Sequence, residues 1–297
     1  MTHPSLQSLL TVEPIAPDTF VGQSIPGNHN RIFGGQLIAQ AISASGLTVA
    51  TDRRVVSIQT TFHRPGNSSE PVTYRVSTVR DGRSFSNRRV EALQNDKLIF
   101  VADTSFQIDE ALPEPEAGAE SERLTPFILS KSALTTSMSV ADAASSFRSY
   151  FDIRTTTAAP SPSDQVLTED LPTVGVPPSS RQATWFRLRE TPPTTGLLNR
   201  AIFAYATDFA VARLVARAKQ VERRDAGNGG SISQSIWWHL EPNLGEWMLS
   251  VQETPHTPGI RGLVFGRIYN SAGSLIASIV QEAFARAGDF SVPARSH

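Results

Sequence analysis

The sequence predicts an α+β protein in which two antiparallel sheets each cover one central helix. A helix-like stretch is followed by four strand-like stretches, and the same order occurs twice along the chain. The strands of the two halves repeat at a spacing of roughly 176–178 residues. Hydrophobic residues make up 39 % of the 297 residues. This content is sufficient for a sizeable core, in which each sheet buries its helix.

Composition excludes several classes of function. The net charge is −1 and there is no long basic run, so no nucleic-acid partner is expected. The chain has no cysteine, which excludes disulfides, thiolate metal sites and a cysteine nucleophile. Its six histidines show no metal-ligand spacing, and no apolar run is long enough for a membrane span. We therefore expect a soluble cytoplasmic protein without a metal, a cofactor or membrane insertion.

The first half begins with a short helix at Ser5–Leu10 and an edge strand near Phe20–Gly22. The stretch Gly27–Gly46 then predicts the first central helix, with apolar residues at helical spacing. Gly34 and Gly35 at its start bare the backbone, so either a ligand or a second helix can approach closely, and free N–H groups there can polarise an oxygen. The strands predicted after this helix are Arg54–His63, Val72–Arg80, Ser84–Gln94 and Leu98–Phe106.

The middle of the chain is less regular. Asp109–Ser121 is acidic, rich in proline and alanine, and typical of a linker. We expect an N-terminal domain over 1–115, a linker over 116–145 and a C-terminal domain over 146–297. Two weak strand candidates, Phe147–Arg154 and Ala183–Glu190, adjoin Pro/Ser-rich stretches.

The second central helix is predicted over Gly196–Gln220, which is apolar almost throughout but has Asp208 at its middle. A buried carboxylate needs hydrogen-bond donors or a positive dipole around it. Asp208 is therefore either the N-cap of a new helical segment or a functional acid. The strands predicted after it are Ser231–His239, Trp247–Glu253, Gly262–Tyr269 and Ser274–Ala283.

The duplication predicts a single working site. Phe62–Asn67 and Trp238–Asn243 share an aromatic-His-x-x-x-Asn pattern at the end of a strand. The same spacing sets Gln281 opposite Thr104, and sets Asp208 opposite the start of the first helix. Only the second half then has an acid in its helix and an amide on its last strand.

Motifs spread over most of the chain carry a family resemblance. They are Arg31–Gln36 with Gln40-Ala41, Phe62–Gly66, Val79–Val90, Gln94-Asn95, Ser105–Gln107, Tyr205–Asp208, Ser235–His239, Asn243–Trp247, Arg261-Gly262 and Val280–Glu282. Together and in this order they resemble the acyl-CoA thioesterase II (TesB-like) family. The resemblance implies a double hotdog fold, in which the two sheets join edge to edge as a pseudo-dimer.

The resemblance also implies a site. In that family a carboxylate, a hydroxyl and a glutamine hold a water for direct attack on the thioester; by position these are Asp208, Ser231 and Gln281. Ser231 stands where threonine is common, and Ser233 and Ser235 are the alternative hydroxyls. The donor to the carbonyl oxygen is either the Gly34-Gly35 end or the turn at Thr207-Asp208. The helix dipole lowers and burial raises the pKa of Asp208, and the sequence leaves the direction open.

The implied activity is hydrolysis of medium- to long-chain acyl-CoA by a homodimer or homotetramer. Two other functions are weighed: a non-catalytic acyl-CoA binder, and a hotdog-fold hydratase or dehydratase, which usually needs an Asp and a His near one helix start. His63 and His239 are expected to be structural. Arginines 88, 89 and 261 either meet the CoA phosphates or face solvent.

Overall fold

The structure is a computed structural model that describes residues 4–25, 30–108, 149–156, 178–193, 196–220 and 229–286. The predicted linker at 116–145 lies outside these residues, together with most of the Pro/Ser-rich stretches. A membrane-spanning helix is not found in the described ranges, since none of their helices is both long and apolar enough.

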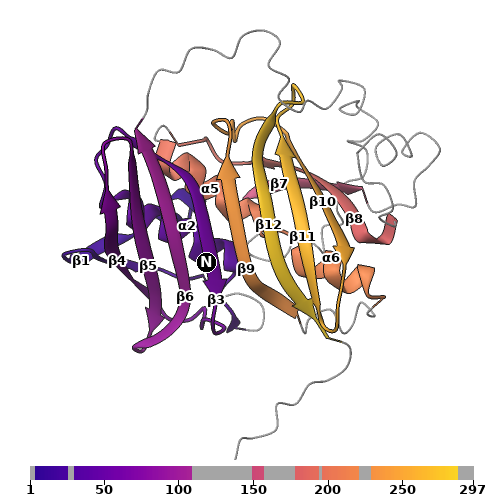
Figure 1. Ribbon diagram of the computed structural model, residues 1–297, viewed down its shortest axis with the longest axis horizontal. Helices are drawn as coiled ribbons and strands as arrows, with labels where there is room; N and C mark the ends of the chain where they lie inside the picture. The colour runs from indigo at the N-terminus through magenta and orange to yellow at the C-terminus, as the bar shows by residue number, and fades with distance from the viewer. Residues whose placement is uncertain are drawn as a thin grey trace, which may run out of the picture.

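The strands form one 12-stranded antiparallel sheet with the order β1-β2-β4-β5-β6-β3-β9-β12-β11-β10-β8-β7 (Figure 1). The strands of the first half are β1 (Glu13–Ala16), β2 (Thr19–Gly22), β3 (Arg53–Phe62), β4 (Val72–Asp81), β5 (Phe85–Gln94) and β6 (Lys97–Ile108). Those of the second half are β7 (Phe151–Thr156), β8 (Arg181–Leu188), β9 (Gly229–Trp238), β10 (Met248–His256), β11 (Arg261–Tyr269) and β12 (Leu275–Ala285). The four strands predicted after each helix are confirmed, and β1 is an addition.

The two halves meet at a seam where β3 pairs with β9 over Ser57–Thr61 and Ser233–Trp237. Thr60 Oγ1 donates to the Gln234 carbonyl at 2.9 Å and accepts from its N–H at 3.2 Å. The order β4-β5-β6-β3 on one side is mirrored by β9-β12-β11-β10 on the other. The halves therefore share one continuous sheet.

Helices α2 (Gly34–Gly46) and α5 (Gly196–Thr207) pack together behind this sheet in opposite directions (Figure 1). The start of α2 lies beside the end of α5, because Gly35 N–H donates to Asp208. At the other end, a Cβ added at Gly46 would lie 2.3 Å from Leu197 Cδ1. Helix α2 is buried from Gly35 to Ser45, which explains its small and apolar composition. The short helix α1 (Leu6–Leu10) crosses to the second half, where Leu6 N–H donates to the Glu190 carboxylate.

The predicted helix at Gly196–Gln220 is two helices, because the chain leaves α5 at Thr207 and begins α6 (Val211–Ala218) after a turn. Ala210 in this turn has φ 65°, in the left-handed region, and is the N-cap of α6. The N-cap interpretation of Asp208 is therefore wrong. Helix α6 packs on β11 and β12 through Val211, Leu214 and Val215.

The alignment of Asp208 with the start of the first helix is also wrong. The starts of α2 at Gly34 and α5 at Gly196 are fewer residues apart along the chain than the corresponding strands of the two halves. The difference arises because α6 lengthens the connection from helix to strand in the second half. Asp208 follows the end of α5, so its counterpart lies at Gly46–Leu47, after the end of α2. Asp208 lies next to Gly35 because the helices run in opposite directions.

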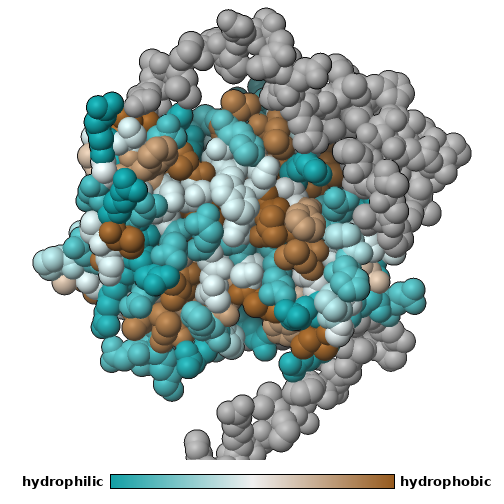
Figure 2. All heavy atoms as spheres, in the orientation of Figure 1, coloured by the Kyte–Doolittle hydropathy of each residue, from teal (hydrophilic) through white to brown (hydrophobic). Residues whose placement is uncertain are grey.

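The sheet face turned away from the helices is largely hydrophilic over the first half, and hydrophobic side chains gather over β12 and β11 (Figure 2). Leu263, Phe265 and Trp237 are each about two-fifths exposed.

Candidate active site

Asp208 sits in the turn after α5 and its carboxylate is bound on both oxygens. Oδ1 accepts from Ser231 Oγ at 2.9 Å and from Gln281 Nε2 at 2.5 Å. Oδ2 accepts from the backbone N–H of Gly35 at 3.1 Å. Gln281 Nε2 also lies 2.8 Å from Ser231 Oγ. The three residues predicted from the sequence thus form one hydrogen-bonded cluster, joined by the start of α2.

Ser231 reaches this cluster through a bulge in β9. Glu282 of β12 pairs with Ser233, but the next residue, Ala283, pairs with Ser231, so Ile232 is the extra residue. In a regular strand alternate side chains point to opposite faces, and Ser231 would point away from the face on which Gln234 lies. The bulge reverses this alternation and turns Ser231 inward. Ser233 and Ser235 line a pocket elsewhere, together with Thr61, His63 and Arg89, so neither replaces Ser231.

The two glycines at the start of α2 are required by close contacts. A Cβ at Gly34 would lie 2.6 Å from Asp208 Oδ2, and a Cβ at Gly35 would lie 2.3 Å from the Tyr205 carbonyl oxygen. Both distances are far below ordinary van der Waals contact. The glycines therefore let α2 approach α5 closely enough for an N–H group to reach the carboxylate. Phe33, just before them, packs edge-on against Tyr205 at 4.9 Å between ring centroids.

Thr207 is held by a residue that the sequence reasoning missed. Its hydroxyl donates to the Ala204 carbonyl at 2.7 Å and accepts from Gln234 Nε2 at 2.6 Å. Gln234 is buried on β9 and pairs in register with Gln281 on β12. The signal in the sequence was a second glutamine on the predicted strand that carries Ser231.

Burial has the largest effect on the pKa of Asp208. Burial raises the pKa of Asp208 to about 6, and the hydrogen bonds from Gln281, Ser231 and Gly35 oppose this rise. This settles the direction that the sequence left open: burial outweighs the donors. A carboxyl with such a pKa is mostly ionised at neutral pH and can accept a proton.

Two amide oxygens near the carboxylate are buried without a donor in the described parts of the chain: Oε1 of Gln281 and Oε1 of Gln234. Neither side-chain amide can exchange the positions of its oxygen and nitrogen without losing a hydrogen bond. Gln281 must present its NH₂ to Asp208, and Gln234 must present its NH₂ to Thr207, whose own hydrogen goes to Ala204. A buried acceptor without a donor costs about 1–3 kcal/mol, so these oxygens favour an additional donor molecule such as water.

Other candidate residues lie away from Asp208. His239 shares a hydrogen bond of 2.9 Å with Ser278, and His63 is exposed. Arg88 neither faces solvent nor is free to bind the CoA phosphates, because it is buried and bonded to Asp81 and Thr48.

The other two arginines are paired on the surface, Arg89 with Asp103 and Arg261 with Glu282. Within the described ranges, no group of three or more His, Cys, Asp or Glu side chains is arranged to hold a metal ion.

Family models and curated relatives agree on one family. A family model described as "Acyl-CoA thioesterase N-terminal domain" matches residues 24–107, and one described as "Acyl-CoA thioesterase C-terminal domain" matches residues 130–285. The "Acyl-CoA thioesterase 2" of Haemophilus influenzae is 29 % identical over 288 residues, which cover 95 % of this chain and 97 % of the relative.

Solved structures show the same similarity. The tesB protein of Mycobacterium avium subs paratuberculosis is 27 % identical, with a TM-score of 0.71, 94 % of this chain covered and 97 % of that chain. A protein from Alicyclobacillus acidocaldarius described as having a hot dog fold has a TM-score of 0.65 at 16 % identity, with 95 % and 98 % of the two chains covered, and shows the fold alone.

Proposed function

The chain belongs to the acyl-CoA thioesterase II (TesB-like) family and is an acyl-CoA thioester hydrolase, and on this basis we propose its substrate and mechanism. The proposed substrate is medium- to long-chain acyl-CoA. The proposed nucleophile is a water held by Asp208, Ser231 and Gln281. The observation that carries the proposal is the partly buried Asp208 carboxylate, whose Oδ1 is bonded to both other side chains. A residue that only capped a helix would not need an amide and a hydroxyl from two strands.

In the proposed step, the water oxygen attacks the thioester carbonyl carbon and Asp208 accepts the proton that the water loses. The carbon–sulfur bond then breaks, the acid is released, and the CoA sulfur leaves as a thiolate that takes up a proton. Gln281 Oε1, which has no donor in the described residues, is suited to accept the second hydrogen of the water. Positioning and proton transfer can suffice here because a thiolate is a fair leaving group.

For the carbonyl oxygen, we propose a donor at the start of α2. The first N–H groups of a helix have no partner within the helix and carry the positive end of its dipole. Gly34 and Gly35 occupy this position, and because the N–H of Gly35 donates to Asp208, we propose the N–H of Gly34 as the donor to the carbonyl oxygen. The turn at Thr207-Asp208 stays the alternative donor, although the Thr207 hydroxyl itself is already engaged with Ala204 and Gln234.

We further propose that the two halves are a pseudo-dimer of hotdog units over 1–115 and 146–297, each wrapping its own helix. The mirrored strand order across the β3–β9 seam supports this division. One unit then contributes Asp208, Ser231 and Gln281, and the other contributes the two glycines.

Thiol release from a panel of acyl-CoAs tests the function. The wild type should release CoA most rapidly from medium or long chains, and Asp208→Asn should lose about 100-fold or more, a scale typical of a lost general base. A wild type that binds acyl-CoA and releases no thiol from any chain length would refute hydrolysis and identify a binder. The chain has no cysteine, so the thiol signal comes from CoA alone.

Cytoplasmic location and assembly into a homodimer or homotetramer stay predictions. Light scattering during size exclusion tests the assembly, and a mass near the 32.2 kDa of one chain would contradict it.

A further inference from the structure

The side chain of Gln234 on β9 connects the end of α5 to the sheet. Its Nε2 donates to the hydroxyl of Thr207, the last residue of α5, at 2.6 Å. The same hydroxyl donates to the Ala204 carbonyl, one turn earlier in the helix, at 2.7 Å. Gln234 and Thr207 are both buried, so bulk water does not compete for the bond between them. This bond therefore fixes the last turn of α5 against β9.

The position of the Asp208 carboxylate depends on this turn. Asp208 directly follows Thr207, and its carboxylate accepts hydrogen bonds from three other elements. The donors are Ser231 on β9, Gln281 on β12 and the N–H of Gly35 on α2. Hydrogen bonds weaken steeply as their geometry departs from the optimum, so all three require a defined distance between the turn and the sheet. The bond from Gln234, one residue before Asp208, sets that distance.

Gln234 is itself held by the first half of the chain. Thr60 of β3 lies opposite it across the seam. The Oγ1 of Thr60 donates to the carbonyl of Gln234 and accepts from its N–H. The backbone of Gln234 is thus bound by a neighbouring strand on each side, because β12 pairs with it as well. The amide that reaches Thr207 therefore extends from a rigid part of the sheet.

Stability does not explain why this position carries a glutamine. Its Oε1 is buried and has no donor among the described residues. Such an acceptor destabilises the fold, and a leucine of similar shape would remove it. The repeat that aligns Trp238 with Phe62 also aligns Gln234 with Ile58, which is fully buried in the apolar core. The sheet can therefore be built with an apolar residue at this position.

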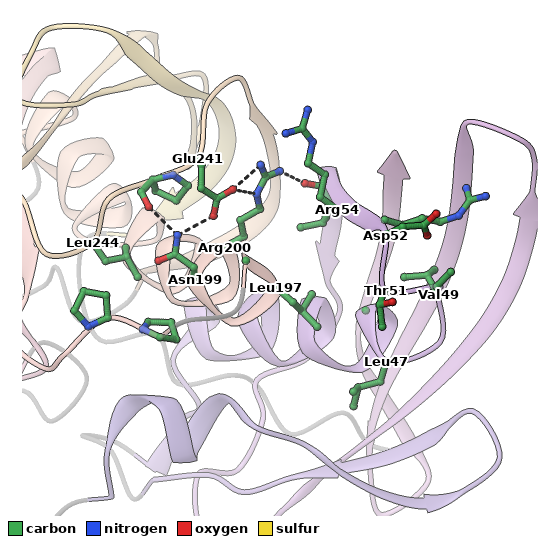
Figure 3. Close-up of a pocket in the computed structure, with 18 of the residues that line it drawn as sticks. Leu47, Val49, Thr51, Asp52, Arg54, Leu197, Asn199, Arg200, Glu241 and Leu244 are labelled. Carbon is green, nitrogen blue, oxygen red and sulfur yellow. Dashed lines mark hydrogen bonds and ion pairs between the residues drawn. The ribbon is translucent and has the colours of Figure 1, made fainter. Parts of the chain in front are cut away.

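The first half holds the end of its helix in a different way. Helix α2 ends at Gly46, which has no side chain, and Leu47 follows it at the wall of a cavity (Figure 3). Arg88 of β5 then binds the hydroxyl and the carbonyl of Thr48. Within the described ranges, an amide on the first strand after the helix binds a hydroxyl at the helix end only in the half that carries Asp208.

We propose that Gln234 is a positioning residue for hydrolysis, which acts through the Thr207 hydroxyl to hold Asp208 at its hydrogen-bonding partners. This inference rests on the proposed function, and Gln234 itself makes no contact with the reacting atoms. Its contribution is to the orientation of the acid. Orientation matters because a displacement of about 1 Å at a reacting group can cost about 100-fold in rate.

Steady-state kinetics of thiol release from dodecanoyl-CoA tests the path through Thr207. Gln234→Leu should lower kcat about 10- to 100-fold and leave KM within about threefold, because the residue orients the acid and does not bind substrate. Thr207→Val keeps the branched shape, removes the hydroxyl and should cause a loss of similar size. Because both variants break the same bond, the double variant should be at most about twofold slower than the slower single variant. Losses that multiply in the double variant would overturn the proposal.

Hydrogen–deuterium exchange at Gly35 is a readout that does not require hydrolysis. The N–H of Gly35 donates to Asp208 Oδ2, so its exchange rate reports whether the carboxylate stays in place. In both single variants this N–H should exchange about tenfold faster than in the wild type, close to its rate in Asp208→Ala, which lacks the acceptor. Unchanged exchange at Gly35 in both would overturn the proposal. A wild type that releases no thiol contradicts the proposed hydrolysis, and the exchange at Gly35 still shows whether Gln234 positions Asp208.

Gln182→Leu is the matched control. Gln182 is another buried glutamine of the second half, its Nε2 donates to Gln252 Oε1, and three strands separate β8 from β9. Its replacement should lower Tm, because Gln252 loses its donor, and should leave exchange at Gly35 unchanged and kcat within about twofold. Gln234→Leu should keep Tm within about 3 °C of the wild type, because the unpaired Oε1 is removed together with one hydrogen bond. A larger fall in Tm for Gln234→Leu than for Gln182→Leu would make Gln234 a structural residue and overturn the proposal.

Discussion

The pKa of Asp208 gives a quantitative prediction for the pH dependence of thiol release. If Asp208 accepts the proton from water, kcat/KM should follow its ionised fraction. With a pKa of about 6, this fraction is about 91 % at pH 7 and about 9 % at pH 5, so kcat/KM should fall about tenfold between them. A carboxyl with an ordinary pKa near 3.8 would lose less than a tenth of its ionised form over the same range.

The assay is the initial rate of thiol release from dodecanoyl-CoA, read with a disulfide reagent that reacts in mild acid. Because the chain has no cysteine, the reagent does not modify the enzyme. Asp208→Asn is the control, since it keeps the shape of the side chain and removes its titration. Its residual activity should lack the step near pH 6. A wild-type profile that is flat between pH 5 and 7, or a step of equal size in Asp208→Asn, would refute the assignment of Asp208 as the base.

Four further outcomes are expected. The folded-state pKa of Asp208 lies above its unfolded value of 3.8, so its ionisation disfavours the folded state as pH rises through about 6. Asp208→Asn should therefore raise Tm relative to the wild type more at pH 8 than at pH 5. An equal shift of Tm at both pH values would contradict this. Ser231→Ala should lower kcat by roughly ten- to 100-fold while Ser231→Thr retains most of it; equal rates for the two would show that the hydroxyl is dispensable. Gly35→Ala should cost about 1–3 kcal/mol through its clash with the Tyr205 carbonyl and lower Tm by several degrees, as a thermal melt would show. Gln40→Leu should cost about 1–3 kcal/mol, because the Leu9 carbonyl would lose the Gln40 amide that donates to it and the buried Tyr74 hydroxyl would lose the Gln40 oxygen that accepts from it; an unchanged denaturant midpoint would contradict that cost.

Much of the fold can be predicted from the spacing of apolar residues and from the order of the helix-like and strand-like stretches in the sequence. Helix α2 and the eight strands that follow the two central helices were predicted because each has a clear apolar pattern and a turn at its ends. The stretch Gly196–Gln220 keeps helical spacing throughout, so a break into α5 and α6 was predicted only in the N-cap interpretation of Asp208, which named the wrong cap residue. The break arises from the left-handed backbone at Ala210, a conformation that alanine does not signal.

The site could be predicted as a set of residues but not as a geometry. Asp208, Ser231 and Gln281 come from motif positions, and their meeting depends on the bulge at Ile232. A bulge changes which face a side chain occupies without changing the local composition, so the sequence left Ser233 and Ser235 as alternatives. Arg88 was misread for a related reason: its partners Thr48 and Asp81 lie on other elements, and only the fold brings them together.

The seam between β3 and β9 has a consequence for synthesis on the ribosome. When residues Ser57–Thr61 of β3 have emerged, their partners Ser233–Trp237 on β9 lie about 172 to 180 residues further along the chain. At about 5–20 residues per second, the outer edge of β3 stays without its neighbour for roughly 10–35 s. During that interval the first half presents an unpaired strand edge of the kind that recruits other chains. Slower translation of the second half should therefore increase aggregation of the nascent protein.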